Sequence, residues 1–235
     1  MSISLADTPT VGLGQFIRES RFVVPTHQRD YSWTDEVTDF LRDIEEAKKN
    51  TTDIYFCGLM VFTSASVPLL KVLDGQQRLA TTLMIFSAIR NWLFKNPEFR
   101  DDATKISTQL LTRDDIGSKP EPKLILTPAN NVTFQKFVIE NAHISEIEAA
   151  YKKTDKQDRN KKLLMAAVGI NQHIEKKADE FASTQAARDY FVDLITYIGS
   201  TVKVVRFVLS GDDAAYTIFE TLNDRGLELA PLVSD

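Results

Sequence analysis

The chain has 235 residues, of which 43% are hydrophobic and 26% charged, a composition typical of a globular protein and not of a disordered or collagen-like chain. This length allows one large domain or two small ones, with a substantial core. The net charge of -5 excludes a surface that is basic all over, so any nucleic acid would have to bind a local patch.

Membrane and disulfide signals are missing from the sequence. No apolar run approaches the roughly 20 residues that cross a bilayer, and the first residues lack a basic segment followed by an apolar one. The single cysteine, Cys57, excludes an internal disulfide and a cysteine metal cluster, and its apolar neighbours favour a thiol packed in the core. We therefore expect a cytoplasmic protein with no membrane partner.

The first third of the chain alternates between helix and strand patterns. Residues 11–20 are typical of a short helix and residues 21–25 of a strand that ends at a proline. A longer helix is predicted after Thr34, a suitable N-cap, up to Lys48 and Lys49. Its buried face is expected to hold Val37, Phe40, Leu41 and Ile44.

Two apolar runs, residues 53–62 and 67–73, predict strands that the four residues 63–66 join as a hairpin. A helix is then predicted over residues 76–94. Its apolar stripe follows helical spacing and consists of Leu79, Leu83, Phe86, Ile89 and Leu93.

The middle of the chain is predicted to be mainly helical. Residues 96–122 lose periodicity and contain prolines, which indicates a long loop or an insertion. The further predicted elements are a short strand at 123–128, helices over 132–181 with a break near 152–162, a helix over 185–198, a strand over 201–210 and a helix over 211–226. Strands near both ends predict an α+β fold: a core of residues 1–96 and 201–235 with a helical insertion of residues 97–200.

The segment "KVLDGQQRLATTLMIF", residues 71–86, interrupts an apolar run with polar residues and a glycine. A strand ending at Leu73, a turn at Asp74 and Gly75 and a helix from Gln76 would aim free backbone N–H groups and the positive end of a helix dipole at one point. Such a point suits an anion.

This segment has two interpretations, an anion-binding site and a helix cap. A phosphate could approach the backbone at Gly75 and take a forked contact from Arg78, while Gln76 or Gln77 read a base or sugar edge. In the alternative, Asp74 caps the helix and Gln77 completes a capping box. Spacing alone favours the capped helix, and the P-loop and Rossmann patterns are both missing.

A second cluster, "PTHQRDYSW", spans residues 25–33. Arg29, with Gln28 before it and Tyr31 and Trp33 after it, suits phosphate contact combined with base stacking. Packing of the two rings ahead of the next helix is an equal alternative.

Three further features have simpler explanations on local grounds. "FETLNDRG", residues 219–226, is a polar helix end stopped by a glycine, although its Glu220 leaves a metal role open. Residues 152–162 hold six basic and two acidic side chains and favour a solvated helix end over a DNA contact. The three histidines lack the spacing of a metal site.

Taken in order, "PTHQRDYSW", "DGQQRLATTL" and "FETLNDRG" resemble the segments "PxYQRxYxW", "DGQQR" and "FExLNxRG" of the GmrSD-type restriction enzyme N-terminal domain family, a ParB/sulfiredoxin-like group. The similarity extends over residues 25–226. It implies a ParB/sulfiredoxin-like mixed core in which the DGQQR turn helps to form a nucleotide or phosphate pocket.

The resemblance also implies which residues build that pocket. They are Asp74, Gly75, Gln76, Gln77 and Arg78 as its lining, Gln28 and Arg29 beside it, and Asn223 and Arg225 as its closure. Catalytic roles fall to two of them: Asp74 would hold a metal ion or orient a water, and Arg78 would neutralise phosphate charge.

The function implied is an NTP-hydrolysing sensor domain of a modification-dependent restriction or phage-defence protein. Its cofactor would be GTP or ATP, with Mg²⁺ as a candidate metal. Its partners would be DNA, modified or not, and a C-terminal effector or nuclease domain or a partner subunit. A non-catalytic DNA-binding or protein-interaction module with a ParB-like fold is the main alternative. A nuclease with Asp74 and Glu220 as metal ligands is a third.

Two departures from the family pattern stand out. His27 occupies the place of the usual Tyr, which changes the ring contact available there. The chain stops at Asp235, where the family continues toward a nuclease-bearing region, and no nuclease motif is visible. We therefore expect a fragment of a longer protein, with any DNA cleavage housed elsewhere.

Overall fold

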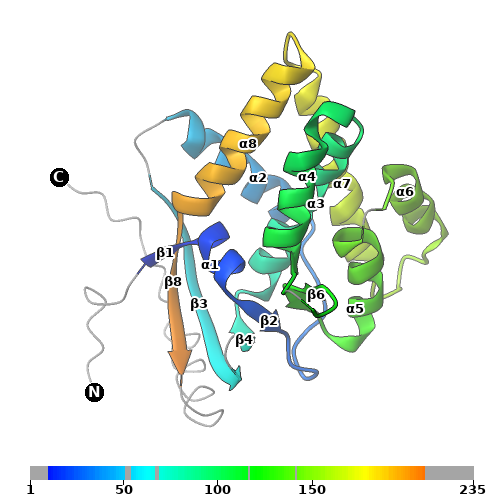
Figure 1. Cartoon of the computed structure of the whole chain (residues 1–235). Coiled ribbons are helices and arrows are strands. Elements are labelled where there is room, and N and C mark those ends of the chain that lie inside the picture. The colour runs from blue at the N-terminus through cyan, green and yellow to red at the C-terminus, as the bar shows by residue number, and fades with distance from the viewer. Residues whose placement is uncertain (1–9, 51–53, 67–68, 116, 141, 210–235) are drawn as a thin grey trace.

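The computed structural model describes residues 10–50, 54–66, 69–115, 117–140 and 142–209, which form a mixed sheet and a group of helices (Figure 1). The strands of the sheet are β1 (Thr10–Gly12), β2 (Arg21–Val23), β3 (Tyr55–Ser66), β4 (Leu69–Asp74), β7 (Leu124–Ile125) and β8 (Val202–Leu209). The helices are α1 (Leu13–Glu19), α2 (Asp35–Lys49), α3 (Gln76–Phe94), α4 (Arg100–Ile106), α5 (Pro128–Phe134), α6 (Ile144–Lys153), α7 (Lys161–Ala178) and α8 (Thr184–Ser200). The predicted α+β class is confirmed.

Strand order in the sheet is β1-β8-β3-β4-β2-β7. Neighbours β3 and β8 are parallel, as are β2 with β4 and β2 with β7, while β3 with β4 and β1 with β8 are antiparallel. A separate pair, β5 (Thr112–Arg113) and β6 (Glu121–Pro122), is also antiparallel. Because β2 and β4 are parallel, the segments that follow both strands leave the sheet at the same edge.

The two long predicted helices are confirmed. In α2 the buried residues are the four predicted from helical spacing: Val37, Phe40, Leu41 and Ile44. In α3 the five residues of the predicted stripe have no exposed surface, but polar side chains on other faces, such as Thr81, Thr82 and Ser87, are buried as well. Helices α4, α7 and α8 and the π-helical turns η3 (Ser107–Leu111) and η4 (Gln135–Ile139) all contact α3. It is therefore a central helix and not an amphipathic surface helix.

Arg90 is the charged side chain that α3 carries into this core, with 1% of its surface exposed. Its guanidinium donates to the carbonyls of Val138, Ile139 and Glu140 at 3.1, 2.6 and 2.9 Å, at the end of η4. Burial lowers the pKa of Arg90 to about 10. The side chain satisfies carbonyls that the end of a helix leaves without partners.

Two local predictions are wrong. Residues 96–122 are not mainly loop: the 3-10 turn η2 (Pro97–Phe99), α4 and η3 occupy much of the segment. Phe99, Ala103, Ile106 and Leu110 recur at spacings of four, three and four and are all buried, a helical stripe that the prolines and glycine of the segment obscured. Residues 63–66 are also not a hairpin connection, because β3 continues through Ser66.

The short strand predicted near residue 124 is confirmed as β7, which pairs with β2 through Phe22 opposite Leu124. A strand from the segment 97–200 therefore belongs to the same sheet as β2. The division into a core and a helical insertion, and the ParB-like character of the core, stay predictions. The predicted helix over 211–226 lies outside the described residues.

Candidate functional site

A cavity of about 540 Å³ lies at the sheet edge where β2 and β4 end. It is lined by Gln28, Arg29, Trp33, Leu73, Asp74, Gly75, Gln76, Gln77 and Arg78. The parallel pairing of β2 and β4 brings the loop after β2 to the start of α3, although 45 residues separate Gln28 from Leu73. Ligand sites of α/β sheets commonly form where parallel strands end in this way.

The start of α3 has no side-chain cap. Gly75 is the N-cap residue, with φ 98° in the left-handed region, and no side chain bonds to the first turn as a cap. A Cβ at Gly75 would lie 2.6 Å from Cγ of Met60, so glycine is required here for space as well as conformation. The predicted capping box of Asp74 and Gln77 is wrong, since both side chains bond elsewhere. The positive end of the dipole of α3 therefore faces the cavity without a capping carboxylate.

Arg78 is held firmly by its surroundings. It donates to the carbonyls of Cys57 and Leu59, both at 2.7 Å, and to Oδ2 of Asp74 at 3.0 Å. The two carbonyls belong to an irregular turn of β3 around Gly58, whose φ is 92°. Three of the five N–H donors of Arg78 are thus occupied by described residues.

The glutamines fix the loop after β2. Gln77 accepts from the backbone N–H of Ser32 at 2.9 Å and donates to the carbonyl of Asp30 at 3.2 Å. Gln28 donates to the carbonyl of Leu73 at 3.2 Å. The amides of Gln28 and Gln77, predicted to belong to the site, therefore also join the loop to β4 and α3.

Gln76 differs from the other two amides. Its Nε2 donates to the carbonyl of Arg29 at 3.0 Å, but its Oε1 is buried and has no hydrogen-bond partner. The residue is 8% exposed. Among the buried side chains of the described segments, this oxygen is the polar atom left without a partner.

Arg29 is exposed, and its guanidinium makes no hydrogen bond or ion pair with any residue that the structure describes. The two arginines of the cavity thus differ: Arg78 forms an ion pair with Asp74, while Arg29 forms none with any residue that the structure describes. Within the described part of the chain, Arg29 is therefore the cavity arginine whose charge is not paired.

The two rings of "PTHQRDYSW" have separate roles. Tyr31 is 5% exposed and its hydroxyl lies 2.8 Å from Oγ1 of Thr81, so it packs in the core. Burial raises its pKa well above the ordinary value. Trp33 is partly exposed, contacts Phe40 with ring centroids 5.6 Å apart, and lines the cavity. Sequence analysis named both rings as stacking candidates, and the structure places only Trp33 in the cavity that the DGQQR residues line.

The loop is also held from the side opposite α3. Asp30 accepts from Oγ1 of Thr127 at 2.7 Å and pairs with Arg159, while Asn130 accepts from the backbone N–H of Tyr31 at 2.7 Å. Arg159 comes from the lysine-rich segment 152–162. Its ion pair shows that this segment has a structural contact besides its solvated surface.

Other candidate groups do not form a site in the described part of the chain. Burial raises the pKa of the Cys57 thiol to about 11, despite the nearby Arg78, so the thiol is unreactive at neutral pH. Within the described ranges, no group of three or more His, Cys, Asp and Glu side chains could hold a metal ion. Asn223 and Arg225, predicted to close the pocket, lie outside the described residues, as does Glu220.

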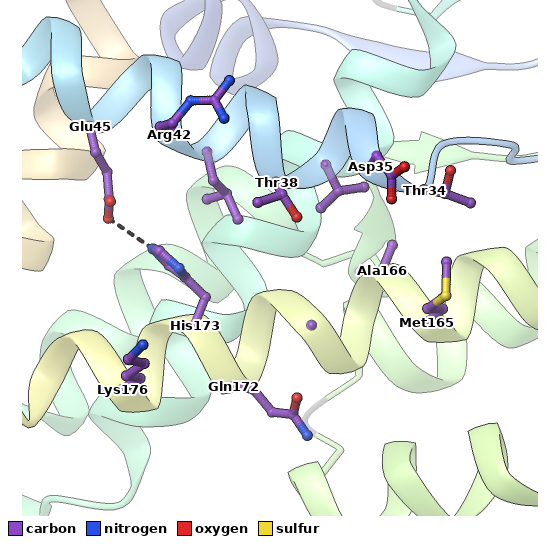
Figure 2. Close-up of a pocket in the computed structure, with 13 residues that line it drawn as sticks. Thr34, Asp35, Thr38, Arg42, Glu45, Met165, Ala166, Gln172, His173 and Lys176 are labelled. Carbon is purple, nitrogen blue, oxygen red and sulfur yellow. Dashed lines mark hydrogen bonds and ion pairs between the residues drawn. The ribbon is translucent and has the colours of Figure 1, made fainter.

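A second cavity, of about 610 Å³, lies between α2 and α7 (Figure 2). At one end Glu45 accepts from Nε2 of His173 at 3.0 Å and from the hydroxyl of Tyr190 at 3.2 Å. Burial tends to raise the pKa of Glu45, but the contacts with His173, Lys177 and Tyr190 outweigh it and lower the pKa. Glu45, His173 and Tyr190 therefore satisfy one another at this end of the cavity, which Arg42 and Lys176 also line.

Comparisons with known proteins identify the family of this chain. A comparison with curated protein sequences found no match. In the part of the chain that the structure describes, no helix is long and apolar enough to cross a membrane. The family model described as "GmrSD restriction endonuclease, N-terminal domain" matches residues 13–232, a span that includes the cavity and all three motifs. The chain therefore belongs to the family of GmrSD restriction endonuclease N-terminal domains.

Proposed function

We propose that this chain is a nucleotide-binding, NTP-hydrolysing sensor domain of a modification-dependent DNA restriction or phage-defence protein. The observation that carries the proposal is the cavity at the uncapped start of α3, lined also by Arg29, which has no ion-pair partner within the described segments. Membership in a restriction endonuclease family supplies the biological setting.

The phosphate groups would lie against the first turn of α3. Gly75 lets them approach the backbone, and the N–H groups of the first turn and the helix dipole favour negative charge there. No described residue holds the guanidinium of Arg29, so it would turn onto a phosphate, whereas Arg78 adds charge from a fixed place. The cavity volume falls in the range usual for small-molecule sites, roughly 300–1,000 Å³.

A magnesium ion fits this site only with help from the ligand. Asp74 is the carboxylate among the residues lining the cavity, and its side chain is 44% exposed although paired with Arg78. Mg²⁺ is commonly held by one or two carboxylates together with phosphate oxygens and waters. Asp74 would therefore hold a metal ion that arrives with the triphosphate, or orient the water for hydrolysis, and Arg78 would keep its carboxylate in place.

The downstream partners follow from the family. Modified DNA and a nuclease domain or subunit are the expected partners of a restriction system, and nucleotide turnover would report recognition to the nuclease. The alternative is a DNA-binding or protein-interaction module that hydrolyses no nucleotide. The two functions differ in the release of phosphate.

The test measures binding of GTP and ATP and release of phosphate by the full chain, with Mg²⁺, with and without modified DNA. We expect Arg29→Gln and Arg78→Ala to weaken binding about tenfold or more, and Asp74→Asn to reduce release more than binding. The control is Arg100→Gln, which removes an exposed arginine at the start of α4, away from the cavity.

Binding that survives both arginine substitutions would contradict the site. Binding without release under any condition would favour the non-catalytic module.

A further inference from the structure

We propose that Trp33 is the platform on which the base of the bound nucleotide stacks, so that the site takes a nucleoside triphosphate in preference to an inorganic polyphosphate. This inference rests on the nucleotide-binding function proposed above and adds the residue that selects a nucleotide over an inorganic polyphosphate.

Trp33 shares its cavity with the start of α3. The indole and the residues Gly75 to Arg78 line the same 540 Å³ space. A ligand with phosphates at Gly75 can therefore reach the indole with its other end. Base stacking on aromatic rings is a common source of affinity for nucleotides because every base has a π face.

The backbone around Trp33 is fixed on both sides. The N–H of Ser32 donates to Gln77 at 2.9 Å, and the N–H of Thr34 donates to Glu36 at 2.8 Å. The ring itself rests against Phe40 at an interplanar angle of 60°. The indole is thus placed before a ligand arrives, which lowers the entropy cost of stacking on it.

The indole also keeps free surface and a free donor. Trp33 is only partly buried, and its N–H has no hydrogen-bond partner among the described residues. The other tryptophan, Trp92, is 6% exposed and packs between Phe99 and Phe191, with centroids at 6.3 and 5.0 Å. One tryptophan is therefore structural, and the other lies at the cavity.

The base is the part of the ligand that can use the indole. A nucleoside triphosphate carries a base with a π face, and an inorganic polyphosphate does not. Stacking on Trp33 therefore favours the nucleotide, while contacts at Gly75 and the first turn of α3 are open to the phosphates of either ligand.

The experiment uses the fluorescence of Trp33. The chain has two tryptophans, so the variant Trp92→Phe leaves Trp33 as the single indole emitter. We expect GTP and CTP to quench this emission, and inorganic tripolyphosphate to bind without quenching it. Calorimetry on the unmodified chain measures the same three affinities and does not depend on the folding of the variant.

Substitution at Trp33 separates stacking from phosphate binding. We expect Trp33→Leu to weaken the binding of GTP and CTP about tenfold, since a stacked base contributes on the order of that much affinity. The affinity for tripolyphosphate should stay unchanged. Trp33→Phe should keep most of the affinity. Because Trp33→Phe also preserves the ring contact with Phe40, the pair of variants distinguishes stacking from loss of structure.

The outcomes separate the two proposals. Equal GTP affinity of Trp33→Leu and the unmodified chain would overturn the role of Trp33 and leave the nucleotide-binding function standing. No binding of GTP, CTP or tripolyphosphate to the unmodified chain would overturn the function itself. Quenching by single-stranded DNA but not by GTP would assign Trp33 to nucleic acid and also overturn the inference.

Discussion

Gly58 and Arg78 fit together so closely that a single added carbon would separate them. A Cβ at Gly58 would lie 2.6 Å from Nη1 of Arg78, the nitrogen that donates to the carbonyl of Cys57. Because glycine has no side chain, Gly58 leaves room for the guanidinium of Arg78, which pairs with Asp74 at the candidate site.

Gly58→Ala is expected to destabilise the fold and displace Arg78. The backbone at this position has φ 92°, and a left-handed non-glycine residue costs about 1–3 kcal/mol. Urea unfolding measures the loss. The control is Gly169→Ala in α7, where a Cβ would meet no atom within 4 Å, and where alanine should stabilise the helix by about 1 kcal/mol. An equal effect of both substitutions would contradict the role of the β3 turn.

Gln77→Glu should loosen the loop after β2. The carboxylate can still accept from Ser32, but it cannot donate to the carbonyl of Asp30. Leaving one buried group without its partner costs about 1–3 kcal/mol. We expect faster hydrogen exchange at the amide of Tyr31 or Ser32, with little change in α7. The substitution Gln15→Glu, at an exposed position, serves as the control. Unchanged hydrogen exchange in the loop would show that Gln77 does not hold the loop after β2 in place.

Arg90→Met is expected to lower the free energy of unfolding by about 3 kcal/mol, because the carbonyls at the end of η4 lose a buried charged donor. Arg90→Lys should restore little of it, since one ammonium cannot reproduce the planar fork. Denaturant unfolding of both variants measures this. A lysine variant as stable as the original chain would show that charge, not the fork, is what the core requires.

Lys123 should make stability depend on pH. The side chain is 4% exposed and donates to the carbonyl of Arg18 at 2.5 Å. Burial, with added repulsion from Arg113 and Arg21, lowers its pKa to about 8. The unfolded value is about 10.4, so the unfolded chain binds more protons between these pH values, and the stability owed to Lys123 rises with pH there.

The variant Lys123→Met isolates this effect. The free energy of unfolding of the original chain minus that of the variant should increase between about pH 8 and pH 10, because the buried amine becomes neutral in the folded state. Urea unfolding at several pH values provides the numbers. A difference that stays constant over this range would contradict the lowered pKa.

The sequence by itself determined the local elements and the family. Helical spacing in α2 and α3, the β-rich runs of β2, β4 and β8 and the three ordered motifs depend on neighbouring residues, so they can be read from the chain. Where the same spacing lay between prolines, as in residues 99–110, local breakers outweighed it and the helix was missed.

Only the tertiary structure decided how the motif residues are used. The family resemblance implied that Gln28 and Arg29 lie beside Asp74, but the contact that brings these distant segments together, the parallel pairing of β2 with β4, is seen only in the structure. The β3 turn decided that Arg78 is fixed while Arg29 is free. The reason is physical: hydrogen-bond partners and burial depend on what packs nearby in space, whereas helix and strand patterns depend on what is near in sequence.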